Sequence, residues 1–63
     1  MRYMQVIEAR DVHGARTAYL EVLGRRGVEL VPSMAIYVET VHRHGQVAGS
    51  WLCYVGHAVQ MAA

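Results

Sequence analysis

Formal charge in this chain is confined to the first two thirds of the sequence. All eleven Asp, Glu and Arg residues lie between Arg2 and Arg43, and residues 44–63 carry no formal charge. Charged side chains are among those that proteins bury least, so a segment without them is expected to be largely buried. A single domain of 63 residues buries only about 60% of the surface that its unfolded chain exposes. We therefore expect residues 44–63 to form part of the core and part of a contact surface for another chain.

Length and composition predict one small domain, residues 1–63, that needs a further source of stability. Cys53 is the only cysteine, so the chain has no internal disulfide, and a lone thiol is typical of a reducing compartment. With 54% apolar residues, the chain holds more of them than a monomer of this size needs, and a partner subunit is the expected stabiliser. We therefore predict a cytoplasmic homo-oligomer, with a dimer as the expected form. Glycine and polar residues interrupt residues 44–63, so we expect no membrane-spanning segment.

Residue spacing near the beginning of the chain predicts a β-strand. Residues 1–9 alternate with a period of two, which places Tyr3 and Ile7 on one side and Met4 and Val6 on the other.

A helix is predicted to follow this strand. Asp11 can cap its first turn with a side-chain oxygen, and Gly27 can take the left-handed conformation that ends many helices. Leu20 projects toward the polar side, and residues 28–31, closed by Pro32, form a connector or an edge element. The apolar positions recur with three-and-four spacing and make one stripe: Val12, Ala15, Ala18, Tyr19, Val22 and Leu23.

The second half of the chain has two interpretations. In the first, residues 35–43 and 46–55 are two strands of a hairpin with a two-residue turn at His44 and Gly45. In the second, the same region forms two helices, the later one over residues 46–61. The β-branched side chains before the turn and the glycines after it favour the hairpin. The expected cross-strand pairs are Val38 with Trp51, Ile36 with Cys53 and Tyr37 with Leu52.

The favoured fold class is α+β: a small β-α-β-β domain with an antiparallel sheet and one helix on a face. The alternative is an N-terminal strand and helix followed by a two-helix hairpin, which would be mostly α. In the favoured fold both faces of the sheet are apolar, and a single helix covers one of them. The β-α-β-β order resembles the organisation of several very small phage-encoded inhibitors, a likeness of fold that implies no site residues.

Side chains that carry chemistry are present, but they form no recognisable catalytic or metal-binding set. His42 and His44 would share one face of a strand, as in a metal-binding H-x-H pair, and His57 or Cys53 would have to complete the site. Neither stands at a recognised ligand spacing. Cys53 lies in an apolar run and is expected to be a buried small hydrophobe, and the carboxylates are scattered along the chain. We therefore expect no enzymatic activity, no cofactor and no bound metal.

Two groups of residues are candidate contacts for partners. One group would bind an anionic partner such as a phosphate or an acidic protein: Arg16, Arg25, Arg26 and Arg43. The other group would anchor a protein interface through large apolar and aromatic side chains: Tyr37, Val38, Trp51, Leu52 and Tyr54, with Leu20 at its periphery.

Together these features predict a small non-enzymatic interaction module that forms a homo-oligomer and binds another macromolecule, which it regulates or inhibits. A second hypothesis is a nucleic-acid-binding regulator that uses the arginine group, although a net charge of +1 is low for such a protein. A third is a small metal-binding protein that uses the histidines and Cys53. The sequence does not identify the partner.

Overall fold

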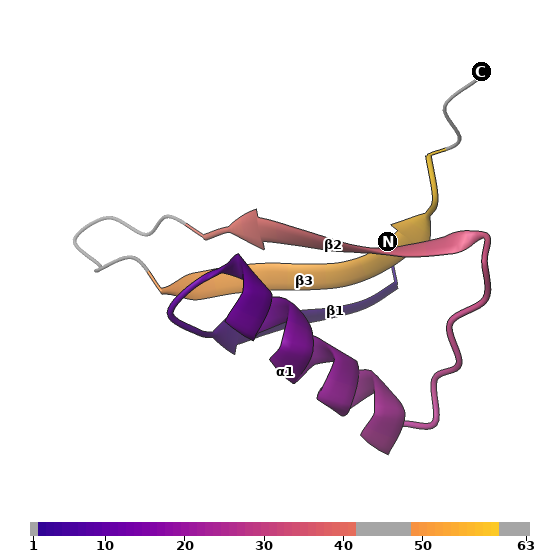
Figure 1. Cartoon of the computed structure of the whole chain (residues 1–63), viewed down its shortest axis with the longest axis horizontal. Coiled ribbons are helices and arrows are strands. Elements are labelled where there is room, and N and C mark those ends of the chain that lie inside the picture. Colours follow the sequence, from indigo (N-terminus) through magenta and orange to yellow (C-terminus); the bar gives the residue numbers. More distant parts are fainter. Residues whose placement is uncertain (1, 42–48, 60–63) are drawn as a thin grey trace.

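The computed structural model describes residues 2–41 and 49–59, in which three strands and one helix are formed (Figure 1). In chain order these elements are β1 (Arg2–Glu8), α1 (Val12–Arg25), β2 (Met34–Thr40) and β3 (Ser50–His57). The predicted α+β fold with a β-α-β-β order is therefore confirmed. Because β2 and β3 are strands, the mostly helical alternative is wrong.

Strand β3 lies in the middle of the sheet. The strand order is β1-β3-β2, and β3 runs antiparallel to both neighbours. Strands β1 and β2 therefore run parallel to each other, connected through α1, with β3 inserted between them as in a split β-α-β unit. On the helix side of β3, Cys53 and Val55 are buried, so a charge there would lose its hydration. No residue of β3 carries a formal charge.

The pairing of β2 with β3 differs by two residues from the register that the sequence predicts. Val38 lies opposite Cys53 rather than Trp51, and Tyr37 lies opposite Tyr54 rather than Leu52. A shift of two residues keeps every side chain on its expected face, because the side-chain period of a strand is two. Hydrophobic alternation therefore cannot distinguish the two registers. The turn predicted at residues 44–45 lies outside the described residues.

Helix α1 begins and ends where local sequence signals place it. Asp11 is the N-cap, and its Oδ1 accepts a hydrogen bond of 2.8 Å from the Gly14 N–H. At the other end Gly27 has a φ of 70°, and the Val28 N–H donates to the Leu23 carbonyl oxygen at 3.0 Å. This Schellman-type ending satisfies backbone groups that the last turn would otherwise leave unpaired.

The core lies between α1 and one face of the sheet. Its buried residues come from α1, at four-residue spacing, and from the strands that it covers: Ala15, Tyr19, Leu23, Ile7, Cys53 and Val55. Val12, which the spacing places in the same stripe, is instead exposed at the first turn of α1. Leu20 is 41% exposed and points away from the sheet, as its position outside the stripe predicts.

An irregularity in β1 is tied to this core by Tyr19. The pairing of β1 with β3 shifts between Arg2 and Gln5, and Tyr3 within this stretch has a φ of 56°. Positive φ is uncommon for a residue with a side chain. The hydroxyl of the buried Tyr19 donates a hydrogen bond to the Tyr3 carbonyl oxygen. This hydrogen bond therefore connects the core to the distorted part of β1 and helps to hold the backbone of Tyr3 in its unusual conformation.

We expect the Tyr19→Phe variant to lose about 1 kcal/mol of unfolding free energy, because the Tyr3 carbonyl loses a part-buried hydrogen-bond donor. Urea unfolding followed by circular dichroism measures this loss. Tyr54→Phe is the matched control, since the Tyr54 hydroxyl bonds to a carboxylate in an exposed position, and it should lose less. Equal losses in the two variants would contradict the proposed role of Tyr19.

We also expect the protein to lose stability at alkaline pH. Burial raises the pKa of the Tyr19 hydroxyl and the pKa of the Cys53 thiol. The unfolded chain therefore releases these protons at a lower pH than the folded chain. The free energy of unfolding should be at its full value below the ordinary pKa values, about 8.5 for Cys and about 10 for Tyr, and should fall as the pH rises through them.

Urea midpoints measured across this pH range test the prediction. The fall above about pH 10 should be smaller in Tyr19→Phe than in the wild-type protein, because the variant lacks one of the groups that titrate. A wild-type midpoint that stays constant through the whole range would show that neither group is held in its protonated form by the fold.

Candidate interaction surface

The sheet face opposite α1 has no cover from any described residue (Figure 1). Directly opposed residues share a face, so the register places Val6, Leu52 and Glu39 together, and likewise Tyr37 and Tyr54. We call this surface the open face. Its apolar and aromatic members come from all three strands: Met4, Val6, Ala35, Tyr37, Leu52 and Tyr54. Met4 and Val6 are 51% and 48% exposed, which is high for apolar side chains that lie side by side on one surface.

An aromatic pair on the open face is held in place by the chain itself. The rings of Tyr37 and Tyr54 stack with centroids 5.3 Å apart and planes 15° from parallel. The Tyr37 hydroxyl donates to the His57 carbonyl oxygen, and the Tyr54 hydroxyl donates to Glu39 Oε1 at 3.2 Å. Both rings are therefore oriented before any partner arrives, which lowers the entropic cost of binding through them.

Gly56 provides the space in which the Tyr37 ring lies. A Cβ atom at position 56 would stand 2.9 Å from Tyr37 Cε2, closer than carbon atoms approach without displacement. Gly56 and Tyr37 thus form a fitted pair, in which an aromatic ring covers a glycine on the adjacent strand. The absence of a side chain at position 56 is a condition for the aromatic pair.

The charges on the open face are carboxylates. Glu39 lies opposite Leu52, and Glu8 lies opposite Ser50 at the end of β1. Loss of hydration raises the pKa of the Tyr54 hydroxyl, and the hydrogen bond to Glu39 raises it further. The hydroxyl is therefore neutral at physiological pH. Within the described residues, the open face is apolar and aromatic at its centre and acidic at its margin.

The residues predicted as interface anchors divide between three places in the structure. Tyr37, Leu52 and Tyr54 are on the open face. Val38 and Trp51 lie on the opposite side of the sheet, where they pack against the core, and Trp51 Nε1 donates to the Ala9 carbonyl oxygen at 3.0 Å.

Leu20 is apart from both groups, on the outer side of α1. Met4 and Val6, which were not among the predicted anchors, belong to the open face. Their shared side of β1 was readable from the alternation, but the pairing of β1 with β3 was not. That pairing joins residues that are far apart in the sequence.

The predicted arginine group is not assembled into one patch. Arg16 and Arg25 are nine positions apart on α1, which corresponds to about two and a half helical turns and places them on opposite sides of the helix. Arg26 is the C-cap residue, beyond the last helical position. Arg43 lies outside the described residues. The three arginines that the structure places are therefore spread around the helix and its end.

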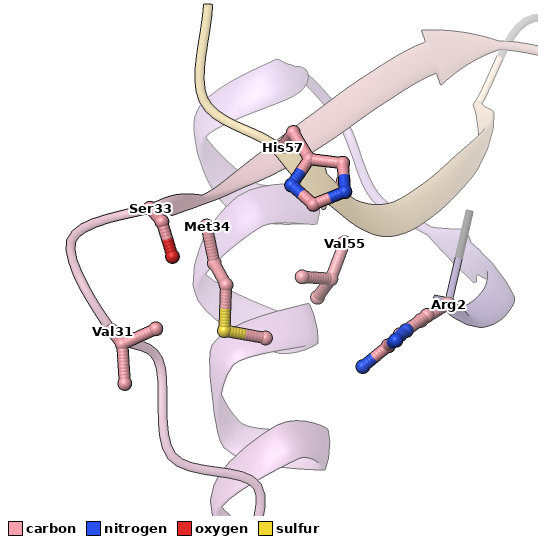
Figure 2. Close-up of a pocket in the computed structure, with 7 residues that line it drawn as sticks. Arg2, Val31, Ser33, Met34, Val55 and His57 are labelled. Carbon is pink, nitrogen blue, oxygen red and sulfur yellow. The ribbon is translucent and has the colours of Figure 1, made fainter.

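A pocket of about 250 Å³ opens at one end of the sheet, beside the connector that precedes β2 (Figure 2). It is lined by Arg2, Val31, Ser33, Met34, Val55, Gly56 and His57. The Arg2 side chain provides a positive charge, and Met34 and Val55 provide apolar walls. In the described part of the chain no hydrogen bond links the Ser33 hydroxyl to the His57 ring, so the pocket shows no nucleophile paired with a base.

The residues considered for metal binding or thiol chemistry are not brought together. No cluster of three or more His, Cys, Asp or Glu side chains suited to a metal occurs among residues 2–41 and 49–59. Cys53 is fully buried, and burial raises the pKa of its thiol, which disfavours the reactive thiolate. His57 is exposed at the end of β3, and His42 and His44 lie outside the described residues. No described helix has the length and hydropathy needed to cross a membrane.

No protein-family model, curated protein or solved structure matches the chain. Its function is therefore inferred from the open face, the charges around that face and the edges of the sheet.

We expect Gly56→Ala to displace the Tyr37 ring, weaken its stacking on Tyr54 and lower the unfolding free energy by about 1–3 kcal/mol, the usual effect of overpacking. The near-ultraviolet circular dichroism of the tyrosines and urea unfolding measure these changes. Gly24→Ala is the matched control, because nothing lies within 4 Å of a Cβ at that position on α1. It should raise stability by up to about 1 kcal/mol through helix propensity. A neutral Gly56→Ala would show that the ring is not seated on this glycine.

Proposed function

We propose that this protein is a small non-enzymatic interaction module that forms a homo-oligomer and binds another protein through its open face, thereby regulating or inhibiting that protein. The open face carries the proposal, because it is an apolar and aromatic surface that the helix of the same chain leaves uncovered. Clustered exposed apolar side chains on a small protein are typical of a binding site. Tyrosine pairs of fixed orientation are typical anchors of protein interfaces.

The acidic margin of the open face specifies the chemistry of the partner. Glu8 and Glu39 would repel phosphate groups, whereas proteins that bind single-stranded nucleic acids place their aromatic side chains in a positively charged groove. The scattered positions of Arg16 and Arg25 on α1 offer no substitute for such a groove. The partner is therefore a protein surface or segment with apolar side chains at its centre and Arg or Lys at its margin.

Self-association follows from the size of the domain. A chain of 63 residues with a small core is marginal in isolation, and the structure shows no disulfide or metal cluster in the residues it describes. A second copy supplies the missing burial. The free thiol of Cys53 fits a reducing compartment, which supports a cytoplasmic location.

Selection from a library of random displayed peptides tests the proposed partner chemistry while the partner protein is still unidentified. We expect the immobilised protein to enrich peptides that combine apolar with basic residues. These peptides should bind the double variant Val6→Thr/Leu52→Thr at least about tenfold more weakly, since two apolar contacts of the open face are lost while β-propensity is kept.

The variant Leu20→Gln is the matched control, because it removes an exposed apolar side chain of similar size from the outer side of α1. Binding should be unchanged in this variant. If peptide affinity falls in Leu20→Gln and persists in the double variant, the binding surface is α1 and the proposal for the open face is wrong. Enrichment of acidic peptides would contradict the predicted charge of the partner.

A further inference from the structure

The two edges of the sheet differ in their capacity to pair with another strand. The outer edge of β1 is interrupted by the register shift between Arg2 and Gln5 and by the positive φ of Tyr3. Irregular pairing is one of the usual ways in which proteins protect a sheet edge. Strand β2 pairs with β3 without interruption over its seven residues, Met34–Thr40. It is therefore the unprotected edge.

The backbone groups that β2 presents outward can be identified from its ladder. The Ala58 N–H donates to the Ser33 carbonyl oxygen, and the Val41 N–H donates to the Ser50 carbonyl oxygen. Ser33 and Val41 are both odd-numbered, and every second residue of a strand bonds to a given antiparallel neighbour. The odd-numbered residues of β2 therefore bond to β3. The N–H and carbonyl groups of Ile36 and Val38 consequently point away from β3. In the described part of the chain no strand lies beyond this edge (Figure 1).

We propose that β2 pairs antiparallel with β2 of a second copy of the chain, about a two-fold axis at Tyr37, to form one continuous six-stranded sheet. This inference rests on the self-association part of the proposed function and specifies the surface that produces it. In this register Ile36 exchanges two hydrogen bonds with the partner subunit's Val38, and Val38 exchanges two with the partner subunit's Ile36. A two-fold axis makes the contact self-complementary and closes the assembly at two copies.

Hydrogen bonding and charge favour this register over its neighbours. A register centred on Ile36 would direct the Val38 carbonyl, in the pair next to the axis, to the partner subunit's Met34, whose N–H already donates to Val31 at 2.9 Å. With the axis at Tyr37, the N–H of Met34 falls only in the outermost pair, and the pairs of Ile36 with Val38 keep all their hydrogen bonds. A register centred on Val38 would bring the two Glu39 side chains two residues closer along the strands. With the axis at Tyr37, each Glu39 lies opposite the partner subunit's Ala35 and no like charges are opposed.

The side chains at this edge suit the same arrangement. Ile36 and Val38 are half-buried and pack against the margin of the core, so a second copy would complete their burial from the side that α1 leaves open. On the other side of the sheet, the two Tyr37 rings would meet at the axis, each already stacked on Tyr54. The dimer would thus join two open faces into one surface of twice the area, available to a single partner protein.

Proline scanning of the two edges tests the proposal in the full chain. Val38→Pro removes an N–H that points outward from β2, so it leaves the internal ladder intact, as edge positions of this kind allow. We expect the dimer association constant, measured by sedimentation at low micromolar concentrations, to fall at least about tenfold. Val6→Pro is the matched control on β1. The Ala9 N–H donates to the Gly49 carbonyl oxygen, so the odd-numbered residues of β1 bond to β3 and the N–H of Val6 points away from β3. The dimer association constant of this variant should be unchanged.

A cysteine at the axis provides a second test that does not depend on how β2 tolerates proline. Residues at a non-hydrogen-bonded antiparallel position have Cα atoms about 4.5 Å apart, within the range that a disulfide spans. Tyr37→Cys should therefore form an intermolecular disulfide on mild oxidation. Leu52→Cys should not, because the two β3 strands would be separated by three strand spacings of about 4.8 Å each. The native Cys53 is buried and should stay reduced.

The outcomes separate this inference from the proposed function. A dimer that persists in folded Val38→Pro, together with cross-linking of Leu52→Cys, would show that two open faces bind each other and would overturn the edge pairing while retaining self-association. A wild-type protein that stays monomeric would overturn both the pairing and the homo-oligomer. Loss of the dimer in Val6→Pro alone would assign the contact to the edge of β1 or to the open face, to which the Val6 side chain belongs, and would equally overturn the proposal. Should Val38→Pro fail to fold, the two cysteine variants decide.

Discussion

The pairing of β3 along both of its edges is the constraint on which the rest of this structure depends. Two buried positions, Cys53 and Val55, lie on this strand, and the helix packs on the side that they face. Strands β1 and β2 are placed only through their ladders with β3. A small domain has few ways to bury one face of a strand, and pairing the strand with two neighbours under one helix is a simple one. The segment without formal charge begins just before this strand and includes it.

A single helix can cover only one face of a three-stranded sheet, and the open face follows from that limit. Its apolar side chains are not spread at random, because the stacked Tyr37 and Tyr54 are oriented by hydrogen bonds to the chain and by the space above Gly56. Fixed orientation on an exposed surface stabilises a monomer little, and in the proposed function its benefit would be realised when a partner binds. The acidic margin formed by Glu8 and Glu39 would then select among partners. The proposed function therefore follows from a surface rather than from a catalytic site.

The sheet edges add a separate property. An edge strand offers hydrogen-bonding groups to any extended chain, and the two edges here are unequal because β1 is distorted and β2 is regular. The distortion of β1 is itself held by the Tyr19 hydroxyl, so the core contributes to protecting one edge. Face and edge would then have different partners: β2 another copy of the chain, and the open face a different protein. Under these proposals, a very small chain would have two contact surfaces that do not compete.

The sequence by itself determined the features that arise from local interactions. The limits of α1 were readable because the Asp11 cap and the Gly27 ending involve neighbouring residues, and the faces of β2 and β3 were readable because a strand has a side-chain period of two. The tertiary structure alone decided the strand order, the register of β2 with β3 and the membership of Met4 and Val6 in the open face. Each of these depends on contacts between distant residues, and alternation is the same in registers that differ by two residues, so pattern alone could not choose between them.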